Sequence, residues 1–414
     1  MASNAKTIAE LLNGDVTVTA TDIADDAVTA AKIATGAVVA DGLGTGAVTN
    51  AKLGTGAITT AKIANTVNLG KRNLIINGAM QVAQRGTSFT GVEAPAYHLD
   101  RWRSHISGVS TKGICTITQD SDVPNGFAKS LKVAVTTADT SLDAWAEYAI
   151  QQRLEGQDLQ RLCKGTSSTK EVTISFWVKS SLTGTYILEM MDDDNSSRHI
   201  NASYTINTSN TWEHKSITFA GDTAGVFDND NAKSMTLSWF LAGGSNFQGG
   251  SLQTSWGGLV QTKRQVGQVN FFANNGNTFQ LTACQMEVGD TATEFEHRSY
   301  AEELTSCQRY YERMSFTSNQ YTSIICYNES TNDARGSLQY QVTKRAAPTI
   351  SATSNAFAAI STGSTGTGVS LTSDSQTVVT ARIKLINSNS TLVDGGASHI
   401  QAKVDAQISM DAEL

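Results

Sequence analysis

Short segments in which apolar and polar residues alternate recur between residues 71 and 299, and this period of two is typical of half-buried β-strands. The clearest are VTISFWV, MTLSWFL and FQLTACQM, whose expected inward residues are Val172, Ile174, Phe176, Val178, Met235, Leu237, Trp239, Leu241, Phe279, Leu281 and Ala283. Further strands are expected at 112–118, 131–135, 146–151, 185–190, 203–207, 212–219 and 268–273. The pattern predicts a mainly β chain with an antiparallel β-sandwich, or jelly roll, over 71–299. It argues against an α/β enzyme fold.

A second, smaller β-domain is expected over residues 315–414. Its predicted strands lie at 321–327, 336–343, 376–386 and 399–409, and the inward residues of the last are Ile400, Ala402, Val404, Ala406 and Ile408. The Ser/Thr/Gly-rich stretch 351–376 is either a flexible loop or a pair of weak strands. Between the two domains, YAEELTSCQRYYER predicts a linking helix over 300–314, with Leu304, Cys307 and Tyr311 on one face.

The first 70 residues have a different pattern, with no aromatic residue, proline or cysteine. Residues 15–64 divide into five tens: DVTVTATDIA, DDAVTAAKIA, TGAVVADGLG, TGAVTNAKLG and TGAITTAKIA. The fourth and ninth places are always aliphatic, and the residues are Val18, Ile23, Val28, Ile33, Val38, Leu43, Val48, Leu53, Ile58 and Ile63. Self-similarity at a fixed period indicates a repetitive architecture.

A spacing of five fits neither one helix face nor one strand face, so each ten-residue unit is expected to bend. A single thin chain would leave the aliphatic side chains in water, whereas several chains wound together would bury them at roughly 25 cal/mol per Å². We therefore expect a homo-oligomeric shaft over 15–70, with these ten side chains as its core. A disordered linker is the alternative, but linkers have no reason to keep aliphatic residues in strict register.

Composition and charge narrow the function classes. Charged residues make up 17% of the chain and the net charge is −7, without a basic stripe, which argues against nucleic acid as a partner. No apolar run is long enough for a membrane span, and the start of the chain lacks the apolar core of a secretion signal. We expect synthesis in a cytoplasm and no membrane insertion. The five cysteines are widely spaced and never occur as CxxC, so we expect buried thiols rather than disulfides or a zinc site.

Several motifs in a fixed order resemble the tail-fibre and related virion appendage proteins of bacteriophages. They are the repeat ending in AKIANT, then KRNLIINGAMQVAQRGTS, the DRW of 100–102, ISFWVKS, QMEVGDTATEFEHRS, EELTSCQRYYERM and KRAAPTI. The resemblance covers nearly the whole chain. In that family the middle region is similar to a carbohydrate-binding-module jelly roll and a small β-domain follows.

The resemblance implies a tail fibre on the virion, made in the host cytoplasm and assembled as a homotrimer, since three chains are usual in viral fibres. By the same analogy, residues 1–14 attach to another virion protein in the tail, neck or capsid. The β-domains then recognise the host cell surface, most simply a glycan. Two other functions stay open: a structural neck or capsid decoration fibre without a receptor, and a polysaccharide depolymerase.

Candidate chemistry is sparse. No catalytic motif such as HExxH, GxSxG or GxxxxGK occurs, so we expect no enzyme, no catalytic residue and no cofactor. Asp192 and Asp194 belong to a DDDN cluster that suits a structural Ca²⁺, although a solvated turn is favoured. Glu287, with Glu294 and Glu296 nearby, lacks a defined opposing carboxylate, so a structural role is expected, such as pairing with Arg101 or accepting backbone N–H bonds.

Sugar recognition needs an aromatic platform edged by polar groups, because the C–H faces of a pyranose stack on rings. The aromatic residues near polar or Gly-rich segments are Tyr204, Trp212, Phe247 and Trp256. They are the candidate glycan-binding residues, and the alternative for each is a half-buried place in the sandwich.

Overall fold

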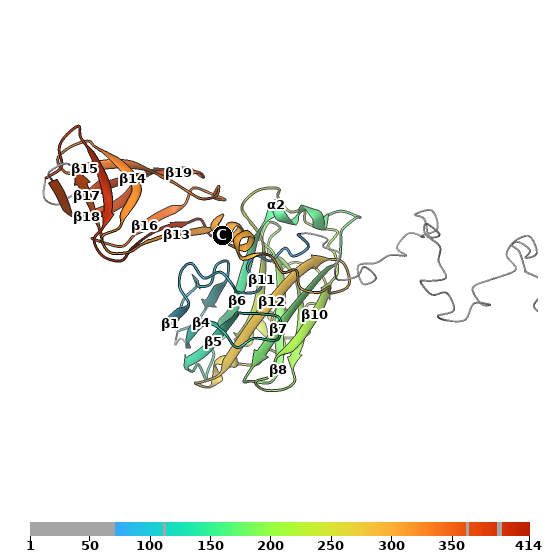
Figure 1. Ribbon diagram of the computed structural model, residues 1–414. Helices are drawn as coiled ribbons and strands as arrows, with labels where there is room; N and C mark the ends of the chain where they lie inside the picture. Colours follow the sequence, from blue (N-terminus) through green and yellow to red (C-terminus); the bar gives the residue numbers. More distant parts are fainter. Residues whose placement is uncertain (1–70, 111–112, 362–363, 387–390) are drawn as a thin grey trace, which may run out of the picture. The chain divides into compact units, whose positions relative to one another are not determined.

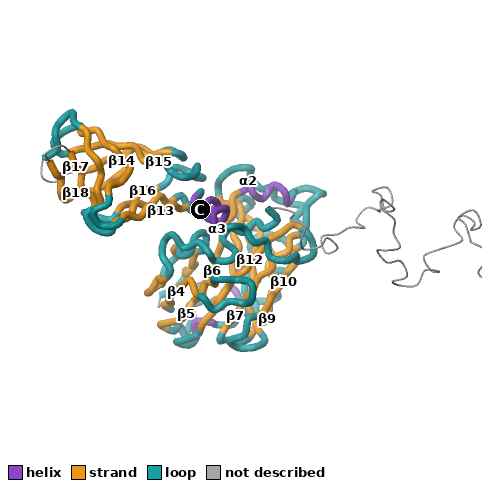
Figure 2. Tube along the Cα trace, in the orientation of Figure 1, coloured by secondary structure: helices purple, strands orange, loops and turns teal. Residues whose placement is uncertain are grey.

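The computed structural model describes residues 71–110, 113–361, 364–386 and 391–414. Strands account for 45% of the structure and helices for 8%, which confirms the mainly β prediction (Figure 2). The predicted attachment peptide, 1–14, and the predicted trimeric shaft with its ten aliphatic core residues lie outside the described residues.

Residues 88–288 form two six-stranded sheets whose strands pair antiparallel (Figure 1). Sheet A contains, in spatial order, β1 (Ser88–Val92), β4 (Ile114–Asp120), β5 (Ser130–Thr137), β12 (Thr278–Val288), β7 (Val172–Ser180) and β10 (Glu213–Phe219). Sheet B contains β2 (Ala96–Tyr97), β3 (Arg103–Ser107), β6 (Glu147–Glu155), β11 (Lys233–Gly243), β8 (Gly184–Asp192) and β9 (Arg198–Ile206). A short helical segment follows β6 and consists of α2 (Gly156–Leu159) and the 3₁₀ helix η6 (Gln160–Leu162).

The inward residues of both sheets pack into one core. The predicted inward faces of β7 and β11 are buried, and Trp239 of β11 lies 5.3 Å from Trp102 and 5.9 Å from Phe176 between ring centroids. Burial of each large apolar side chain contributes about 1.5–3 kcal/mol, so this core stabilises the sandwich without the repeat region.

Strand β12 departs from the predicted alternation. Its pairing with β7 shifts between Thr282 and Gln285, and Ala283 has a positive φ of 54°. This β-bulge turns Cys284 into the core, where it is fully buried, and leaves Ala283 on the opposite face. The prediction that Ala283 faces the core was therefore wrong.

The predicted strand 268–273 is also wrong. Phe271–Ala273 form the 3₁₀ helix η9, and the Asn270 side chain caps it by accepting a 3.0 Å hydrogen bond from the Phe272 backbone N–H. Phe271 and Phe272 are both buried, although they are adjacent in sequence. A strand would place them on opposite faces, so the helical turn is the conformation that buries both rings.

Helix α3 (Tyr300–Gln308) is shorter than the predicted 300–314 segment. It begins with a capping box between Ser299 and Glu302, the pattern that satisfies backbone donors at a helix start. Cys307 is its buried residue, while Tyr311 already belongs to β13 (Tyr311–Phe316).

The C-terminal residues form a second β unit with its own core. Six strands close into a barrel in the order β14 (Tyr321–Asn328), β15 (Asp333–Gln339), β19 (Thr380–Ile386), β18 (Ser364–Gln376), β17 (Phe357–Ser361) and β20 (Ala397–Ala402). Strands β13, β21 (Ala406–Asp411) and β16 (Thr349–Ala352) form a separate three-stranded sheet. The Ser/Thr/Gly-rich stretch supplies β17 and β18, so the paired-strand alternative is the one observed.

The predicted strand 399–409 is two strands with a turn between them. Ile400, Ala402, Ala406 and Ile408 are buried as predicted, but Val404 is 53% exposed. It lies in the turn that separates β20 from β21, where the alternation is interrupted.

Charged side chains join the C-terminal residues to the sandwich. Arg309 donates two hydrogen bonds, of 2.9 and 2.7 Å, to the buried carboxylate of Glu155. Buried Arg101 pairs with Glu413 and donates to the Arg153 carbonyl, so the predicted pairing of Arg101 with Glu287 was wrong.

All five cysteines are unpaired, and four of them are buried as predicted; Cys163 is partly exposed. Burial raises the pKa values of Cys115 and Cys326 to about 12. Among the described residues, no helix has the length and apolar character needed to cross a membrane.

Candidate functional site

The outward face of sheet B is strongly polar. Because neighbouring strands pair in register, outward side chains from β3, β6, β11 and β8 lie in rows across the sheet. The outward residues of these four strands include Arg103, His105, Glu147, Gln151, Arg153, Thr236, Ser238, Glu189 and Met191.

A long connection between β11 and β12 covers part of this face. It includes the 3₁₀ helices η7 (Ser245–Phe247) and η8 (Gln261–Lys263). Under it, Phe240, Ile187 and Ala149 form a small buried apolar cluster with partly buried Leu252. The connection is also paired to β9, since the His199 backbone N–H donates to the Gly257 carbonyl at 2.9 Å. The rest of the face stays open as a groove.

Arg264 lies at the base of this groove and joins two buried carboxylates. Its guanidinium donates two hydrogen bonds to Glu189, of 2.8 and 2.6 Å, and one of 2.8 Å to Glu147. The other oxygen of Glu147 lies 2.8 Å from Nε2 of His105. Burial works against ionisation of both Glu147 and Arg264. The hydrogen bond from His105 and the charge of Arg264 nevertheless lower the pKa of Glu147, and the two carboxylates raise the pKa of Arg264.

Further hydrogen bonds fix the remaining side chains. Gln151 donates to the Ser238 hydroxyl at 3.0 Å and accepts from Arg103 at 3.0 Å. At one border, the Asp193 carboxylate accepts from Lys233 at 2.5 Å and from the Thr236 hydroxyl at 2.7 Å. These bonds hold the polar groups in place before any ligand arrives, which lowers the entropic cost of binding.

The open space encloses about 250 Å³. Its lining residues, which we call the polar groove, are His105, Glu147, Gln151, Arg153, Glu189, Met191, Asp193, Ser197, Lys233, Thr236, Ser238, Leu259, Gln261 and Arg264. They offer amide, hydroxyl and charged groups that both donate and accept hydrogen bonds. This arrangement suits a ligand with many hydroxyl groups.

None of the four aromatic candidates is among the residues that line the polar groove. Tyr204 and Phe247 are each 5% exposed, and Tyr204 packs in the core against Phe176 and Tyr186. Neither ring presents a face to a ligand, because the surrounding protein covers both rings. For Tyr204 and Phe247 the alternative reading, a place within the sandwich, is the one observed.

Trp212 and Trp256 are half-buried and hold other segments in place. The Trp212 indole N–H donates to Asp122 at 3.1 Å, and that of Trp256 donates to the Ala220 carbonyl at 2.8 Å. Glycan contact by these two side chains stays a prediction.

The acidic cluster is a hydrogen-bonded turn. Asp192 is fully buried, pairs with Lys164, and accepts hydrogen bonds from the backbone N–H groups of Asp194 and Asn195 at 3.0 Å. The Lys164 ammonium therefore occupies the place beside Asp192 that a cation would take. Within the described parts of the chain, no group of three His, Cys, Asp or Glu side chains is arranged to hold a metal ion.

Glu287 has the structural environment that the sequence indicated. It accepts hydrogen bonds from the Thr293 backbone N–H at 2.8 Å, the Thr293 hydroxyl at 2.7 Å and the Gln285 amide at 2.8 Å. Glu296 accepts from the Asn73 backbone N–H at 2.8 Å. Both carboxylates tie segments together.

Comparison with known proteins gives distant similarities. No protein-family model matches the chain, and no curated protein is significantly similar to it. Among solved structures, the enzymatically active domain of tailspike protein 4 from bacteriophage CBA120 has 14% identity and a TM-score of 0.29, covering 52% of this chain and 21% of the tailspike chain. A C-terminal family 22 carbohydrate-binding module of Clostridium thermocellum has 13% identity and a TM-score of 0.27, covering 48% and 91%. A xylan-binding domain from Paenibacillus barcinonensis has 12% identity and a TM-score of 0.25, covering 50% and 94%. At these values the similarities assign neither a family nor an activity to the chain.

Proposed function

We propose that this chain is a bacteriophage fibre, a tail fibre, that binds a glycan of the host cell surface through the polar groove. In this proposal residues 1–14 attach to the virion, residues 15–70 wind into a trimeric shaft, and the β-domains lie beyond it. The motif order described above supports the fibre assignment.

The observation that carries the glycan assignment is the ordered polar groove on sheet B. Hydrogen bonds to the buried Arg264 guanidinium hold Glu147 and Glu189 in place, so these groups are preorganised for a ligand. The groove also contains positive and negative groups side by side, which suits sugars that carry charged substituents. Individual sugar contacts are weak, and three such sites on one fibre would raise avidity by about 10²–10⁴-fold.

We also propose that the chain binds without cleaving. Cleavage of a glycosidic bond needs one carboxylic acid and one carboxylate free to act on opposite sides of the sugar bond. Here Glu147 and Glu189 share the guanidinium of Arg264, and Glu147 is bonded to His105 as well. A clear halo on a lawn of host bacteria treated with the purified protein would establish a depolymerase instead.

The test is binding of the purified full chain to an array of bacterial surface polysaccharides, together with competition against phage adsorption. The double variant His105→Ala/Lys233→Ala removes two partly exposed groups of the polar groove and should lose binding to charged polysaccharides by at least about tenfold. Lys132→Ala is a matched control, because Lys132 is 31% exposed and paired with Asp120 on sheet A, while Lys233 is 34% exposed and paired with Asp193. If the wild type neither binds a polysaccharide nor competes with the phage, a structural decoration fibre becomes the better assignment.

The trimer is tested separately by light scattering on the full chain. A mass of three chains is expected, and deletion of residues 15–64 should lower it while leaving the sandwich folded. A single-chain mass for the intact protein would refute the shaft.

A further inference from the structure

The outward face of sheet A carries one large aromatic side chain among polar neighbours. Trp177 of β7 lies beside Thr282 of β12 and His214 of β10, and its ring centroid is 5.4 Å from that of His214. The Trp177 ring is half-buried, and its indole N–H makes no hydrogen bond to any described residue. A large aromatic ring that stays partly in solvent on a polar strand face is a feature that folding of the core does not require, and its indole N–H is available to a ligand.

Three further rings rise beside Trp177 and form a wall. Phe127 lies 5.3 Å from Phe295 and 5.2 Å from His297, and Phe295 lies 5.1 Å from His297 between ring centroids. Phe127 belongs to the loop between β4 and β5, whereas Phe295 and His297 follow β12. Two loops distant in sequence therefore bring aromatic rings to the same place.

The outward face of sheet A around Trp177 and the wall of three rings enclose a groove of about 520 Å³. Its lining residues, which we call the aromatic groove, are Asn125, Gly126, Phe127, Ser175, Trp177, His214, Ala283, Ala292, Thr293, Glu294, Phe295 and His297. This volume is in the range of about 300–1,000 Å³ typical of small-molecule sites. The bulge at Ala283 contributes to the shape, because it turns the larger Cys284 side chain away from the groove.

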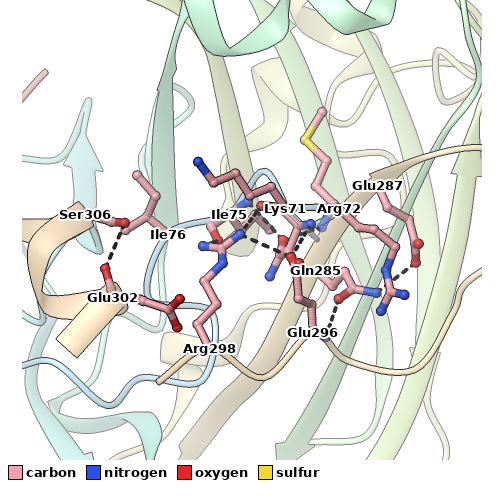
Figure 3. A network of polar contacts seen from close by, with 12 residues as sticks. Lys71, Arg72, Ile75, Ile76, Gln285, Glu287, Glu296, Arg298, Glu302 and Ser306 are labelled. Carbon is pink, nitrogen blue, oxygen red and sulfur yellow. Dashed lines mark hydrogen bonds and ion pairs between the residues drawn. The ribbon is translucent and has the colours of Figure 1, made fainter. Parts of the chain in front are cut away.

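Hydrogen bonds on both sides of Phe295 fix the wall that follows β12. The Glu294 carbonyl accepts from Arg72 at 3.0 Å, and the Glu296 backbone N–H donates to Gln285 at 2.8 Å. Figure 3 shows the surrounding network, in which Arg72, Gln285, Glu287, Glu296 and Arg298 converge on this segment. The backbone that carries Phe295 and His297 is thus anchored to β12 and to the residues that precede the sandwich.

Hydrogen bonds of Asp122 hold the loop that carries Phe127. Its carboxylate accepts from Lys179 at 2.5 Å and from the Trp212 indole at 3.1 Å, while its carbonyl accepts from the Ser130 hydroxyl at 2.8 Å. At the other end of the loop, the Thr282 hydroxyl donates to the Lys129 carbonyl at 2.7 Å. Both walls of the aromatic groove are therefore preorganised.

We propose that the aromatic groove is a second carbohydrate-binding site, one that takes neutral pyranose units of a bacterial surface polysaccharide. The rings provide surfaces on which sugar C–H groups stack, and the indole, imidazole, amide and hydroxyl groups provide both donors and acceptors for sugar hydroxyls. A proline-rich peptide also stacks on aromatic rings, but its backbone offers mainly carbonyl acceptors. Such a peptide therefore needs only hydrogen-bond donors from the protein. The mixed donors and acceptors favour the sugar.

The charge of the lining residues sets the class of sugar. The aromatic groove contains Glu294 and no lysine or arginine, so it does not attract a carboxylated or sulfated sugar. The polar groove on the other sheet contains Arg153, Lys233 and Arg264. The two sites thus select different sugars, and the second does not depend on glycan binding by the first.

The test uses the full chain on an array that contains both neutral and acidic bacterial polysaccharides. Trp177→Ala should reduce binding to neutral polysaccharides by at least about tenfold and leave binding to acidic ones unchanged. The double variant His105→Ala/Lys233→Ala should keep neutral binding, so failure of the polar groove is distinguished from failure of the aromatic groove. Trp145→Ala is the matched control, because Trp145 is a 54% exposed tryptophan that lines neither groove.

Phe127→Ala provides a second variant on the opposite side of the groove, and its loss of neutral binding should match that of Trp177→Ala. Unfolding curves followed by tryptophan fluorescence establish that the variants are folded. Three results would overturn the proposal: no neutral polysaccharide bound by the wild type, equal neutral binding by wild type and both groove variants, or competition at this groove by a proline-rich peptide with no sugar bound.

Discussion

His199 makes the sandwich sensitive to mild acid. The side chain is fully buried on β9, next to the connection that covers part of sheet B, and neither ring nitrogen has a hydrogen-bond partner of good geometry. Burial, together with the charge of Arg264, lowers the pKa of His199 from 6.5 to about 4. The folded protein therefore holds the neutral imidazole, while the unfolded chain takes up a proton below pH 6.5.

The sign and size of the effect follow from linkage. Because the unfolded state binds more protons between the two pKa values, the contribution to stability is complete above pH 6.5 and decreases as pH falls towards 4. Between pH 7 and pH 5 the loss is about 2 kcal/mol, and the full loss in stronger acid is about 3 kcal/mol. We expect the Gly257 connection to loosen first, since it pairs directly with the His199 backbone.

The measurement is urea unfolding of wild type and His199→Phe at pH 7, 6 and 5, followed by tryptophan fluorescence. All six tryptophans lie between residues 102 and 256, so the signal reports the sandwich alone. The difference in free energy of unfolding between the two proteins should shift by about 2 kcal/mol in favour of the variant from pH 7 to pH 5. A substitution of exposed His399 controls for the removal of a histidine elsewhere. A wild-type-to-variant difference that stays constant across this pH range would refute the argument.

Three further predictions concern buried charge and backbone fit. Arg264→Ala should lower the free energy of unfolding by about 3–5 kcal/mol, because it strands two buried carboxylates, and the urea midpoint measures it. Lys344→Met should lower the free energy of unfolding by a similar amount, since Lys344 and Glu312 form a 2.5 Å ion pair that is at most 1% exposed. The double variant with Glu312→Leu should recover most of this loss in calorimetry of the full chain. A double variant that recovers no stability would contradict the pairing argument. Gly108→Ala should destabilise by at least about 2 kcal/mol, because φ is +65° and a Cβ would lie 1.8 Å from the Trp145 carbonyl oxygen; an unchanged melting temperature would contradict this.

The alternating pattern correctly predicted the strands in which one face is fully buried in the core. The predicted inward residues of VTISFWV and MTLSWFL are all buried in the core. The pattern failed where the chain departs from period two for a local reason: a bulge at Ala283, a capped 3₁₀ turn after Asn270, and a turn at Val404. Each of these depends on backbone geometry or on a side-chain cap that composition does not indicate.

The candidate sites were harder to predict for a different reason. Aromatic residues near polar segments predicted Tyr204 and Phe247 as glycan-binding residues, but both side chains are buried in the structure. The side chains of the polar groove come from four strands and from the β8–β9 and β11–β12 connections, and the strand register brings the strand residues together. One signal was available: in the run EYAIQQRLE, four of the five outward positions are polar, and these are Glu147, Gln151, Arg153 and Glu155.

Trp177 was visible in the sequence as an outward residue of VTISFWV, but its role depends on the aromatic wall that folds against it. Phe127, Phe295 and His297 are separated from it by 50 to 120 positions of chain, and no local pattern links them. What links them is the polar network around Glu287 and Asp122, whose members would otherwise be read as solvated loop residues. The network around Glu287 also explains why polar side chains such as Gln285 and Glu287 are buried on the outer face of sheet A. Their hydrogen bonds hold loops that carry binding groups, so changing Asp122 or Glu287 should weaken neutral-sugar binding more than it weakens the core, whereas core substitutions should do the reverse.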